Sequence, residues 1–200
     1  MTAPGPVAPL DLPDDKKEAR RVVRAARREW RAAGRHRIDG EALATHGVQL
    51  VRESGARTVT LFAAWDIEPP TAHLTRALLD AGVRVLVPLT LPSLALDWAE
   101  VRACPEGDVV GEEDLDLGPA LGLDGIARAD LVLTPGLAVD QRGVRLGQGG
   151  GCYDRALPRR GTGVKVVTVL HDAELVPSLP SEPHDLPVDG VLRPSGVTWF

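Results

Sequence analysis

The residue types best suited to chemistry gather between positions 142 and 155, in a run rich in glycine. Glycine occupies four of the five positions from 147 to 151, and Arg145, Asp154 and Arg155 flank the run. Because glycine has no Cβ, the backbone N–H groups of such a loop can come close to an anion and surround it. A helix that follows directly adds the positive end of its dipole, and the Asp154 carboxylate can hold a Mg²⁺ that bridges phosphates. The pattern therefore indicates a site for the phosphates of a nucleotide.

Two well-known nucleotide-binding motifs do not account for this loop. No Gly-Lys-Ser/Thr closes it, so it is not a Walker A loop. Counting from Gly147 and Gly149, the third glycine of a dinucleotide fingerprint would fall at position 152, which is cysteine. On the residues alone, a flexible glycine loop beside a helix, with no ligand, remains the alternative.

A second concentration of charge lies near the N-terminus. Residues 16–37 contain ten Lys or Arg against Glu18 and Glu29, whereas the whole chain has a net charge of −5. Spacing at i+3 or i+4, typical of one helix face, relates Lys16, Arg20, Arg24, Arg27 and Arg31. An acidic body with one basic segment favours a specific anionic ligand over bulk nucleic acid. Two alternatives remain: a solvated helix face, or a polyanion- or RNA-binding module that uses helix 16–33.

Alternating helices and strands must position these residues. Helical spacing predicts helices over residues 16–33, 39–53 and 70–81, the first of them capped by Asp14 or Asp15. Short apolar runs predict strands over residues 58–62, 83–87, 94–98, 130–133, 164–170 and 188–192, with Pro88 ending the second. Residues 103–128 give no clear pattern.

This alternation predicts the fold class α/β, a three-layer single domain with a central, mostly parallel sheet and an N-terminal helical extension. The domain is expected to span residues 14–200. Residues 1–13 contain four prolines and no periodicity, which predicts a disordered tail.

The composition excludes several other classes of protein. Cys104 and Cys152 are the only cysteines in 200 residues, too few for a disulfide framework or a four-cysteine zinc site. The longest apolar runs, such as residues 61–65, are far shorter than the ~20 residues of a bilayer span, and the first residues lack the pattern of a signal peptide. We therefore expect a cytoplasmic protein, a monomer rather than an oligomer, with no membrane or nucleic-acid partner.

Five blocks of the sequence resemble one known family. The segment Arg145–Asp154 reads Arg-Leu-Gly-x-Gly-x-Gly-x-Tyr-Asp, and residues 134–140 before it read Thr-Pro-Gly-Leu-Ala-Val-Asp. The others are Lys16-x-x-x-Arg20, the segment from Phe62 through Glu68 to Thr71, and Leu-Pro-Ser-Glu-Pro-His-Asp at residues 179–185. In this order the blocks resemble the 5-formyltetrahydrofolate cyclo-ligase family, also called 5,10-methenyltetrahydrofolate synthetases.

The resemblance implies a cleft that binds ATP, Mg²⁺ and 5-formyltetrahydrofolate, with or without a polyglutamate tail. Its nucleotide-binding residues would be Lys16, Arg20, Arg145, Leu146, Gly147, Gln148, Gly149, Gly150, Gly151, Cys152 and Tyr153. Its folate-binding residues would be Ala63, Glu68, Gln148, Gly149, Gly150, Gly151 and Cys152. Asp154 and Asp185 would hold Mg²⁺. Charge would be stabilised, in a reaction without a protein nucleophile, by Lys16, Arg20 and Arg145.

The implied reaction begins when the N5-formyl oxygen attacks the γ-phosphate of ATP. N10 then attacks the resulting iminium phosphate, and departure of phosphate gives 5,10-methenyltetrahydrofolate, with ADP as the other product. A family relative that binds nucleotide without turning over folate is the remaining alternative.

The chain departs from the family pattern at four places. Val139 replaces the usual Phe, and Trp65 stands where many members carry a smaller or polar residue. Cys152-Tyr153-Asp154 stands where the family commonly has Tyr-Tyr-Asp, and the family's aromatic block before the central strand is not recognisable in residues 114–124. An aromatic residue that stacks on folate would then be missing there, or would come from Trp65 or Trp98.

Overall fold

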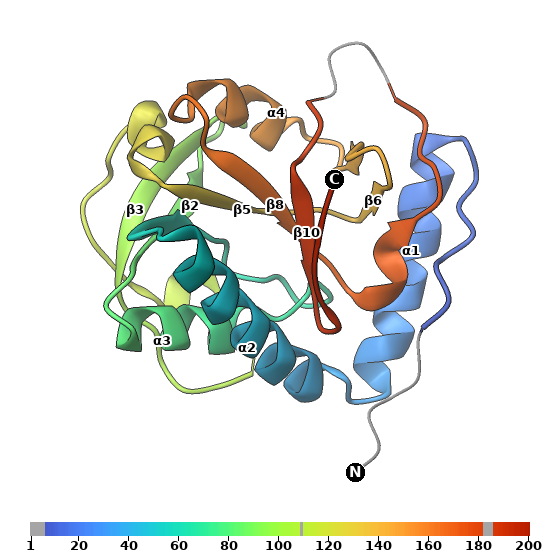
Figure 1. Ribbon diagram of the computed structural model, residues 1–200, viewed down its shortest axis with the longest axis horizontal. Coiled ribbons are helices and arrows are strands. Elements are labelled where there is room, and N and C mark those ends of the chain that lie inside the picture. Colours follow the sequence, from blue (N-terminus) through green and yellow to red (C-terminus); the bar gives the residue numbers. More distant parts are fainter. Residues whose placement is uncertain (1–6, 109, 182–185) are drawn as a thin grey trace.

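A sheet of eight strands crosses the middle of the protein in the order β11-β10-β8-β5-β1-β2-β3-β4 (Figure 1). The computed structural model describes residues 7–108, 110–181 and 186–200. The strands of this sheet are β1 (Thr58–Thr60), β2 (Arg84–Thr90), β3 (Leu96–Ala103), β4 (Asp116–Leu117), β5 (Leu131–Pro135), β8 (Lys165–Val169), β10 (Gly190–Arg193) and β11 (Gly196–Trp199).

The centre of the sheet is parallel. β10, β8, β5, β1 and β2 pair in parallel, whereas β11 at one edge and β3 and β4 at the other pair antiparallel. The prediction of a mostly parallel sheet is confirmed. Since parallel strands end at the same edge of a sheet, the loops that follow β1 and β5 open on the same side, where ligands of such folds bind.

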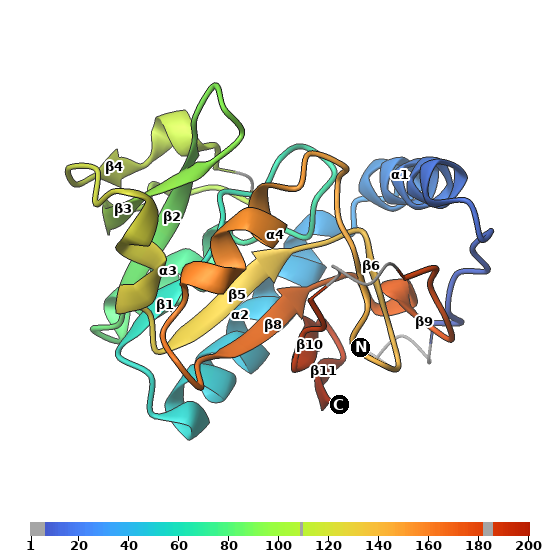
Figure 2. The same ribbon diagram turned by 90° about the horizontal axis from the view of Figure 1, so that it is seen from above.

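Side chains alternate between the two faces of the sheet and build two cores. Val85 and Val87 of β2 pack with α2 (His36–Ser54) and α3 (Ala72–Asp80), whereas Leu86 between them packs on the opposite face. That face is covered by α4 (Cys152–Ala156) and by the 3-10 helices η2 (Leu123–Arg128) and η3 (Leu157–Arg159) (Figure 2). The predicted three-layer α/β domain is therefore confirmed.

Helix α1 (Lys16–Ala32) lies to one side of these layers, next to a small second sheet (Figure 2). The strands of that sheet, in spatial order, are β7 (Arg145–Leu146), β6 (Ala138–Asp140) and β9 (Leu175–Val176). The apolar face of α1 joins the sheet in one buried cluster of Ala19, Val23, Leu137, Ala138, Leu146, Val176 and Leu179. The Asp15 side chain accepts the N–H of Glu18 at 2.8 Å and caps the helix, which confirms the predicted N-terminal helix.

A buried ion pair fixes α1 to the domain. Arg27 donates from Nε to Glu174 Oε1 at 2.6 Å and from Nη2 to Oε2 at 2.9 Å, and both side chains are 0 % exposed. Arg27 Nη2 also donates to the backbone oxygen of Gly136 at 2.6 Å. Glu174 ends the 3-10 helix η4 (Asp172–Glu174) and also accepts the N–H of His171. Because a buried charge is tolerated only when it is paired, this contact sets where α1 lies.

Several predicted boundaries are wrong. The strand predicted over residues 58–62 ends at residue 60, and that predicted over 94–98 continues to residue 103. β2 does not stop at Pro88 but continues to Thr90. The backbone oxygen of Leu86 accepts the N–H of Leu61, so the backbone polar groups of Leu86 face β1. The backbone nitrogen of Pro88, two residues later, faces the same side, but β2 continues there beyond its last residue pair with β1. The missing N–H of proline therefore breaks no ladder bond.

Helix α2 begins at His36, three residues before the predicted start at Asp39. Asp39 does not cap the helix: its carboxylate is buried and lies 3.0 Å from His171 Nδ1. The uninterpreted stretch 103–128 contains β4, η2 and the 3-10 helix η1 (Glu112–Asp114). The short strands β6, β7, β9 and β11 were not predicted, since two to four residues carry little periodicity.

The predicted tail is in contact with the domain where the structure describes it. Residues 7–13 form no helix or strand, but the N–H of Leu10 donates to Ala173 O at 2.8 Å. Leu10 and Leu12 also pack on the cluster beneath α1. Residues 7–13 therefore contact the domain, although they form no regular secondary structure. No helix in the described ranges is long and apolar enough to cross a membrane.

We expect Arg27→Met to lower the free energy of unfolding by about 3–5 kcal/mol, because it leaves the Glu174 charge buried without its partner. Arg21→Met is the matched control, since Arg21 is exposed and pairs with Glu18 on the same helix; it should cost less than about 1 kcal/mol. Chemical denaturation measures both values. Equal effects of the two substitutions would show that the buried pair does not anchor α1.

Candidate functional site

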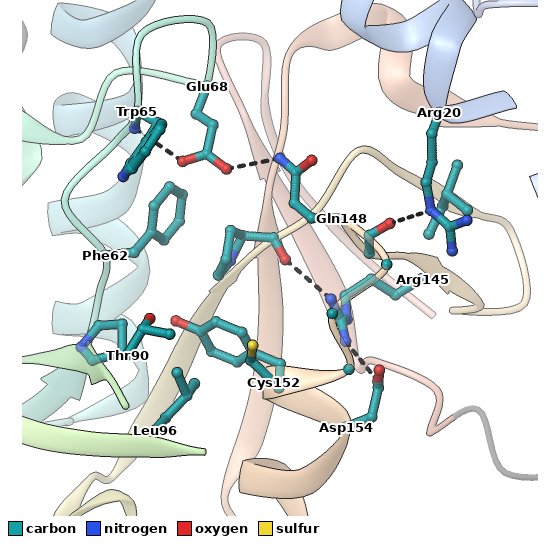
Figure 3. A pocket seen from close by; sticks show the side chains of 18 of the residues that line it. Arg20, Phe62, Trp65, Glu68, Thr90, Leu96, Arg145, Gln148, Cys152 and Asp154 are labelled. Carbon is teal, nitrogen blue, oxygen red and sulfur yellow. Dashed lines mark hydrogen bonds and ion pairs between the residues drawn. The ribbon is translucent and has the colours of Figure 1, made fainter. Parts of the chain in front are cut away.

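One cavity of about 520 Å³ lies between α1, the glycine-rich loop and the loop after β1. It is lined by Lys16, Arg20, Ala63, Glu68 and every residue from Arg145 to Asp154, which are all the predicted site residues except Asp185. Asp185 lies outside the described residues. Figure 3 shows Arg20, Arg145 and Asp154 on one side of this cavity and Phe62, Trp65, Thr90 and Leu96 on the other.

The glycine-rich loop joins β7 to α4 and bends sharply under α1. Gly149 has φ +105° and Gly151 has φ +66°, backbone conformations that disfavour any residue with a Cβ. A Cβ on Gly149 would also lie 3.6 Å from the Arg20 guanidinium. That distance is an ordinary van der Waals contact, so it is the positive φ values, not crowding by Arg20, that favour glycine here.

The basic face of α1 turns toward the domain. Arg20 Nε donates to Gly147 O at 2.9 Å, and Arg24 donates to Gln148 in the same loop. Further along the helix, Arg31 pairs with Asp66 in the loop after β1 at 2.7 Å. With the buried Arg27, the predicted stripe thus contacts the domain rather than forming a solvated face.

Arg145 is held inside the cavity wall. Its side chain is only 6 % exposed, and Nη2 donates to Asp154 Oδ1 at 2.7 Å while Nη1 donates to Pro135 O at 3.3 Å. Its guanidinium lies 5.9 Å from the ring centre of Tyr153. Burial and these partners give the positive charge one fixed position at the edge of the glycine-rich loop.

Glu68 is the buried carboxylate of the opposite wall. Its Oε2 accepts the backbone N–H of Trp65 at 3.0 Å, and its Oε1 accepts from Gln148 Nε2 at 3.1 Å (Figure 3). Each carboxylate oxygen can accept two hydrogen bonds, so Glu68 retains acceptor capacity for a ligand. Ala63, five residues earlier in the same loop, adds a small apolar surface to this wall.

Tyr153 and Cys152 begin α4 at the floor of the cavity. The Tyr153 hydroxyl is buried without a hydrogen-bond partner among the described residues. Burial raises the pKa of this hydroxyl far above its usual value, so the group stays protonated. Cys152 is a free, partly buried thiol.

The fit of these residues to Mg²⁺ rests on Asp154. No group of three or more His, Cys, Asp or Glu side chains that could hold a metal occurs among residues 7–108, 110–181 and 186–200. Mg²⁺ usually takes one or two carboxylates and otherwise water and phosphate oxygens. The Asp154 side chain is 40 % exposed at the cavity and uses one oxygen for Arg145. This carboxylate fits a Mg²⁺ that arrives with phosphates.

Comparison with known proteins decides the family. The model of the 5-formyltetrahydrofolate cyclo-ligase family matches residues 13–194. The chain belongs to this family. The 5-formyltetrahydrofolate cyclo-ligase of Mycolicibacterium smegmatis is 35% identical over 189 residues, which cover 91% of this chain and 95% of the relative. That of Escherichia coli K12 is 36% identical over 149 residues, 71% of this chain and 80% of the relative.

Solved structures show the same fold. The 5,10-methenyltetrahydrofolate synthetase of Aquifex aeolicus superposes with a TM-score of 0.73 at 24% identity, over 92% of each chain. The synthetase of Mycoplasma pneumoniae gives 0.70 at 16% identity, over 89% of this chain and 98% of the other. Membership of the cyclo-ligase family makes the chain an enzyme, a ligase of folate one-carbon metabolism. The resemblance seen in the sequence is confirmed.

Six of the described residues that line the cavity of this cyclo-ligase family member were not predicted from the sequence. The unassigned lining residues are Phe62, Pro88, Thr90, Leu96, Glu112 and Pro135. Phe62 could have been found from its place beside Ala63, whereas Glu112 lies in the stretch without a pattern. Burial and the neighbouring Glu113 raise the pKa of Glu112.

The structure decides between the two candidate aromatic residues. Trp98 is fully buried in the core, with its ring 6.3 Å from that of Tyr153. Trp65 is 80% exposed and lines the cavity. Of these two tryptophans, Trp65 is the one that can offer a ring face to a ligand.

We expect Tyr153→Phe to leave the free energy of unfolding unchanged or to raise it by about 1 kcal/mol, because it removes a buried hydroxyl that has no partner among the described residues. Thr71→Val is the contrasting variant: the Thr71 hydroxyl is buried and donates to Phe62 O at 2.6 Å, so its loss should cost about 1–3 kcal/mol. Thermal and chemical unfolding compare the two. A clear destabilisation by Tyr153→Phe would mean that its hydroxyl has a partner.

Proposed function

We propose that the cavity binds ATP with Mg²⁺ and 5-formyltetrahydrofolate side by side, and that the chain forms 5,10-methenyltetrahydrofolate, ADP and phosphate. The observation that carries this proposal is the convergence of two sets of residues on one cavity. Cations and an open backbone loop lie on one side, and a buried carboxylate with aromatic rings lies on the other. Its volume of about 520 Å³ is within the range of small-molecule sites.

The nucleotide side carries the groups that phosphoryl transfer needs. This reaction depends on positioning and charge neutralisation rather than on a protein nucleophile. Lys16, Arg20 and Arg145 would neutralise the triphosphate, and the backbone from Leu146 to Tyr153 would cradle it. Mg²⁺, bound with the phosphates and Asp154, would supply charge neutralisation at the β- and γ-phosphates; Asp185 remains the predicted second ligand.

The folate side carries a carboxylate that suits a 2-amino-4-oxo ring. Two neighbouring N–H groups of such a ring match the two oxygens of a carboxylate, as in other paired hydrogen bonds. Glu68 would accept them, while Ala63, Cys152 and residues 148–151 adjoin the rest of the molecule. Trp65 and Phe62 would contact its flat faces, since aromatic rings prefer offset-stacked or edge-on contact.

The reaction then follows from bringing the two ligands together. The formyl oxygen attacks the γ-phosphorus, the bond from that phosphorus to the bridging oxygen breaks, and ADP leaves. N10 attacks the activated formyl carbon and loses its proton. The bond from that carbon to the phosphorylated oxygen breaks, phosphate departs, and the N5–C–N10 bridge keeps the positive charge. The residues of the cavity position the reactants and stabilise charge throughout.

The alternatives are less well supported. The stripe of arginines on α1 contacts the domain, which argues against a polyanion- or RNA-binding face. A nucleotide-binding relative without folate turnover would have no use for a buried carboxylate beside an exposed tryptophan at the cavity. A cytoplasmic location, a monomeric state and the handling of polyglutamate tails remain predictions.

The direct test is the absorbance of 5,10-methenyltetrahydrofolate during incubation with 5-formyltetrahydrofolate, with and without ATP and Mg²⁺. We expect product only when both are present, with one ADP formed per product. Product without ATP, or ATP binding without product, would overturn the proposal.

We expect Asp154→Asn to lower kcat/KM on the order of 100-fold, because charge stabilisation at the phosphates is lost. Asp124→Asn is the control: Asp124 is an exposed carboxylate that pairs with Arg159 and does not line the cavity. Turnover that survives Asp154→Asn intact would remove Asp154 from the site.

We expect Trp65→Ala to raise KM for 5-formyltetrahydrofolate about tenfold with little change in KM for ATP, as stacking on a flat ring contributes about 1–3 kcal/mol. Trp65→Phe should keep most of the affinity. Trp199→Ala, at a half-exposed ring outside the cavity, is the control. An equal rise in both KM values would contradict a contact specific to folate.

A further inference from the structure

A chain of side-chain hydrogen bonds runs from α1 to the buried carboxylate. Arg24 Nη2 donates to Gln148 Oε1 at 2.8 Å and to Gln148 O at 3.1 Å, and Arg24 Nε lies 3.3 Å from the same Oε1. Gln148 Nε2 donates in turn to Glu68 Oε1 at 3.1 Å. Arg24 itself does not line the cavity, and the side chain that connects it to the cavity is Gln148.

The chemistry of these groups fixes the direction of the chain. Arginine has five N–H donors and no acceptor, so the amide oxygen of Gln148 must face Arg24. The amide NH₂ group must then face Glu68, which accepts it as a carboxylate. The Trp65 N–H holds the other oxygen of Glu68, so the carboxylate is restrained from both ends (Figure 3).

We propose that Arg24 and Gln148 are positioning residues that hold Glu68 in the orientation that receives the folate ring. This inference rests on the proposed folate-binding role of Glu68. Gln148 also belongs to the glycine-rich loop, so the chain links the loop that would hold ATP to the wall that would hold folate. The docking of α1 thereby contributes to folate affinity without a contact between Arg24 and the ligand.

The test is a double-mutant cycle with KM for 5-formyltetrahydrofolate as the readout. Arg24→Ala and Gln148→Met should each raise this KM about tenfold, with kcat changed less than about threefold, since hydrogen bonds to charged groups contribute about 1.4 kcal/mol or more. If Arg24 acts through Gln148, Arg24→Ala should add less than about twofold when Gln148 is already methionine. Arg24→Lys, which keeps a donor without an acceptor, should restore part of the affinity.

Arg21→Ala is the matched control, because it removes the same charge from the same helix without touching Gln148. It should leave KM unchanged. Circular dichroism and the thermal midpoint should show that Arg24→Ala and Arg24→Lys remain folded. The full effect of Arg24→Ala persisting in the Gln148→Met background would mean a direct electrostatic role, and would overturn the positioning chain.

Glu68→Gln separates this inference from the proposed function. If Glu68→Gln raises KM for 5-formyltetrahydrofolate but Arg24→Ala does not, the positioning chain is wrong while Glu68 keeps its folate role. If Glu68→Gln leaves KM unchanged, the folate role of Glu68 is wrong and the chain has no functional target.

Discussion

The docking of α1 through the buried pair of Arg27 and Glu174 is the constraint on which the site depends. Two charges that are 0 % exposed can persist only in mutual contact, so the helix has one position. In that position Arg20 and Arg24 reach the glycine-rich loop, and Arg31 reaches the loop after β1. The cavity is enclosed between these three segments. Without α1, the cavity would lose Lys16 and Arg20, two of the three cations that the described residues contribute to its nucleotide side.

The large sheet explains why those two loops meet beneath the helix. The parallel strands β1 and β5 are adjacent and end at the same edge of the sheet, and the chain continues from β5 through β6 and β7 into the glycine-rich loop. Glu68 follows β1, and Arg145 lies at the start of β7. Their separation along the chain is large, but the parallel topology brings their loops together. Glycine then permits the close backbone approach that larger residues would prevent.

Much of this arrangement could be predicted from the sequence, and the rest fails for physical reasons. The long helix α1 and the buried strands carry clear periodicity, and the glycine-rich loop is informative because few other constraints produce four glycines in five positions. Glu112, Thr90 and Leu96 line the cavity through tertiary packing alone, which leaves no local pattern. The burial of Arg27 has no local signal either, since its spacing matches that of the neighbouring arginines. Its partners Gly136 and Glu174 lie 109 and 147 residues away. The end of β2 was predicted wrongly because a proline interrupts a strand only where its missing N–H faces a paired neighbour.

The central claim is that one cavity under α1 holds both reactants of the cyclo-ligase reaction. A crystal structure with a non-hydrolysable ATP analogue, Mg²⁺ and 5-formyltetrahydrofolate tests it most directly. The account predicts the phosphates against residues 147–151 and Arg20, the 2-amino-4-oxo ring at Glu68, and the formyl oxygen facing the γ-phosphorus. Either ligand bound outside this cavity, or phosphates turned away from the glycine-rich loop, would contradict it.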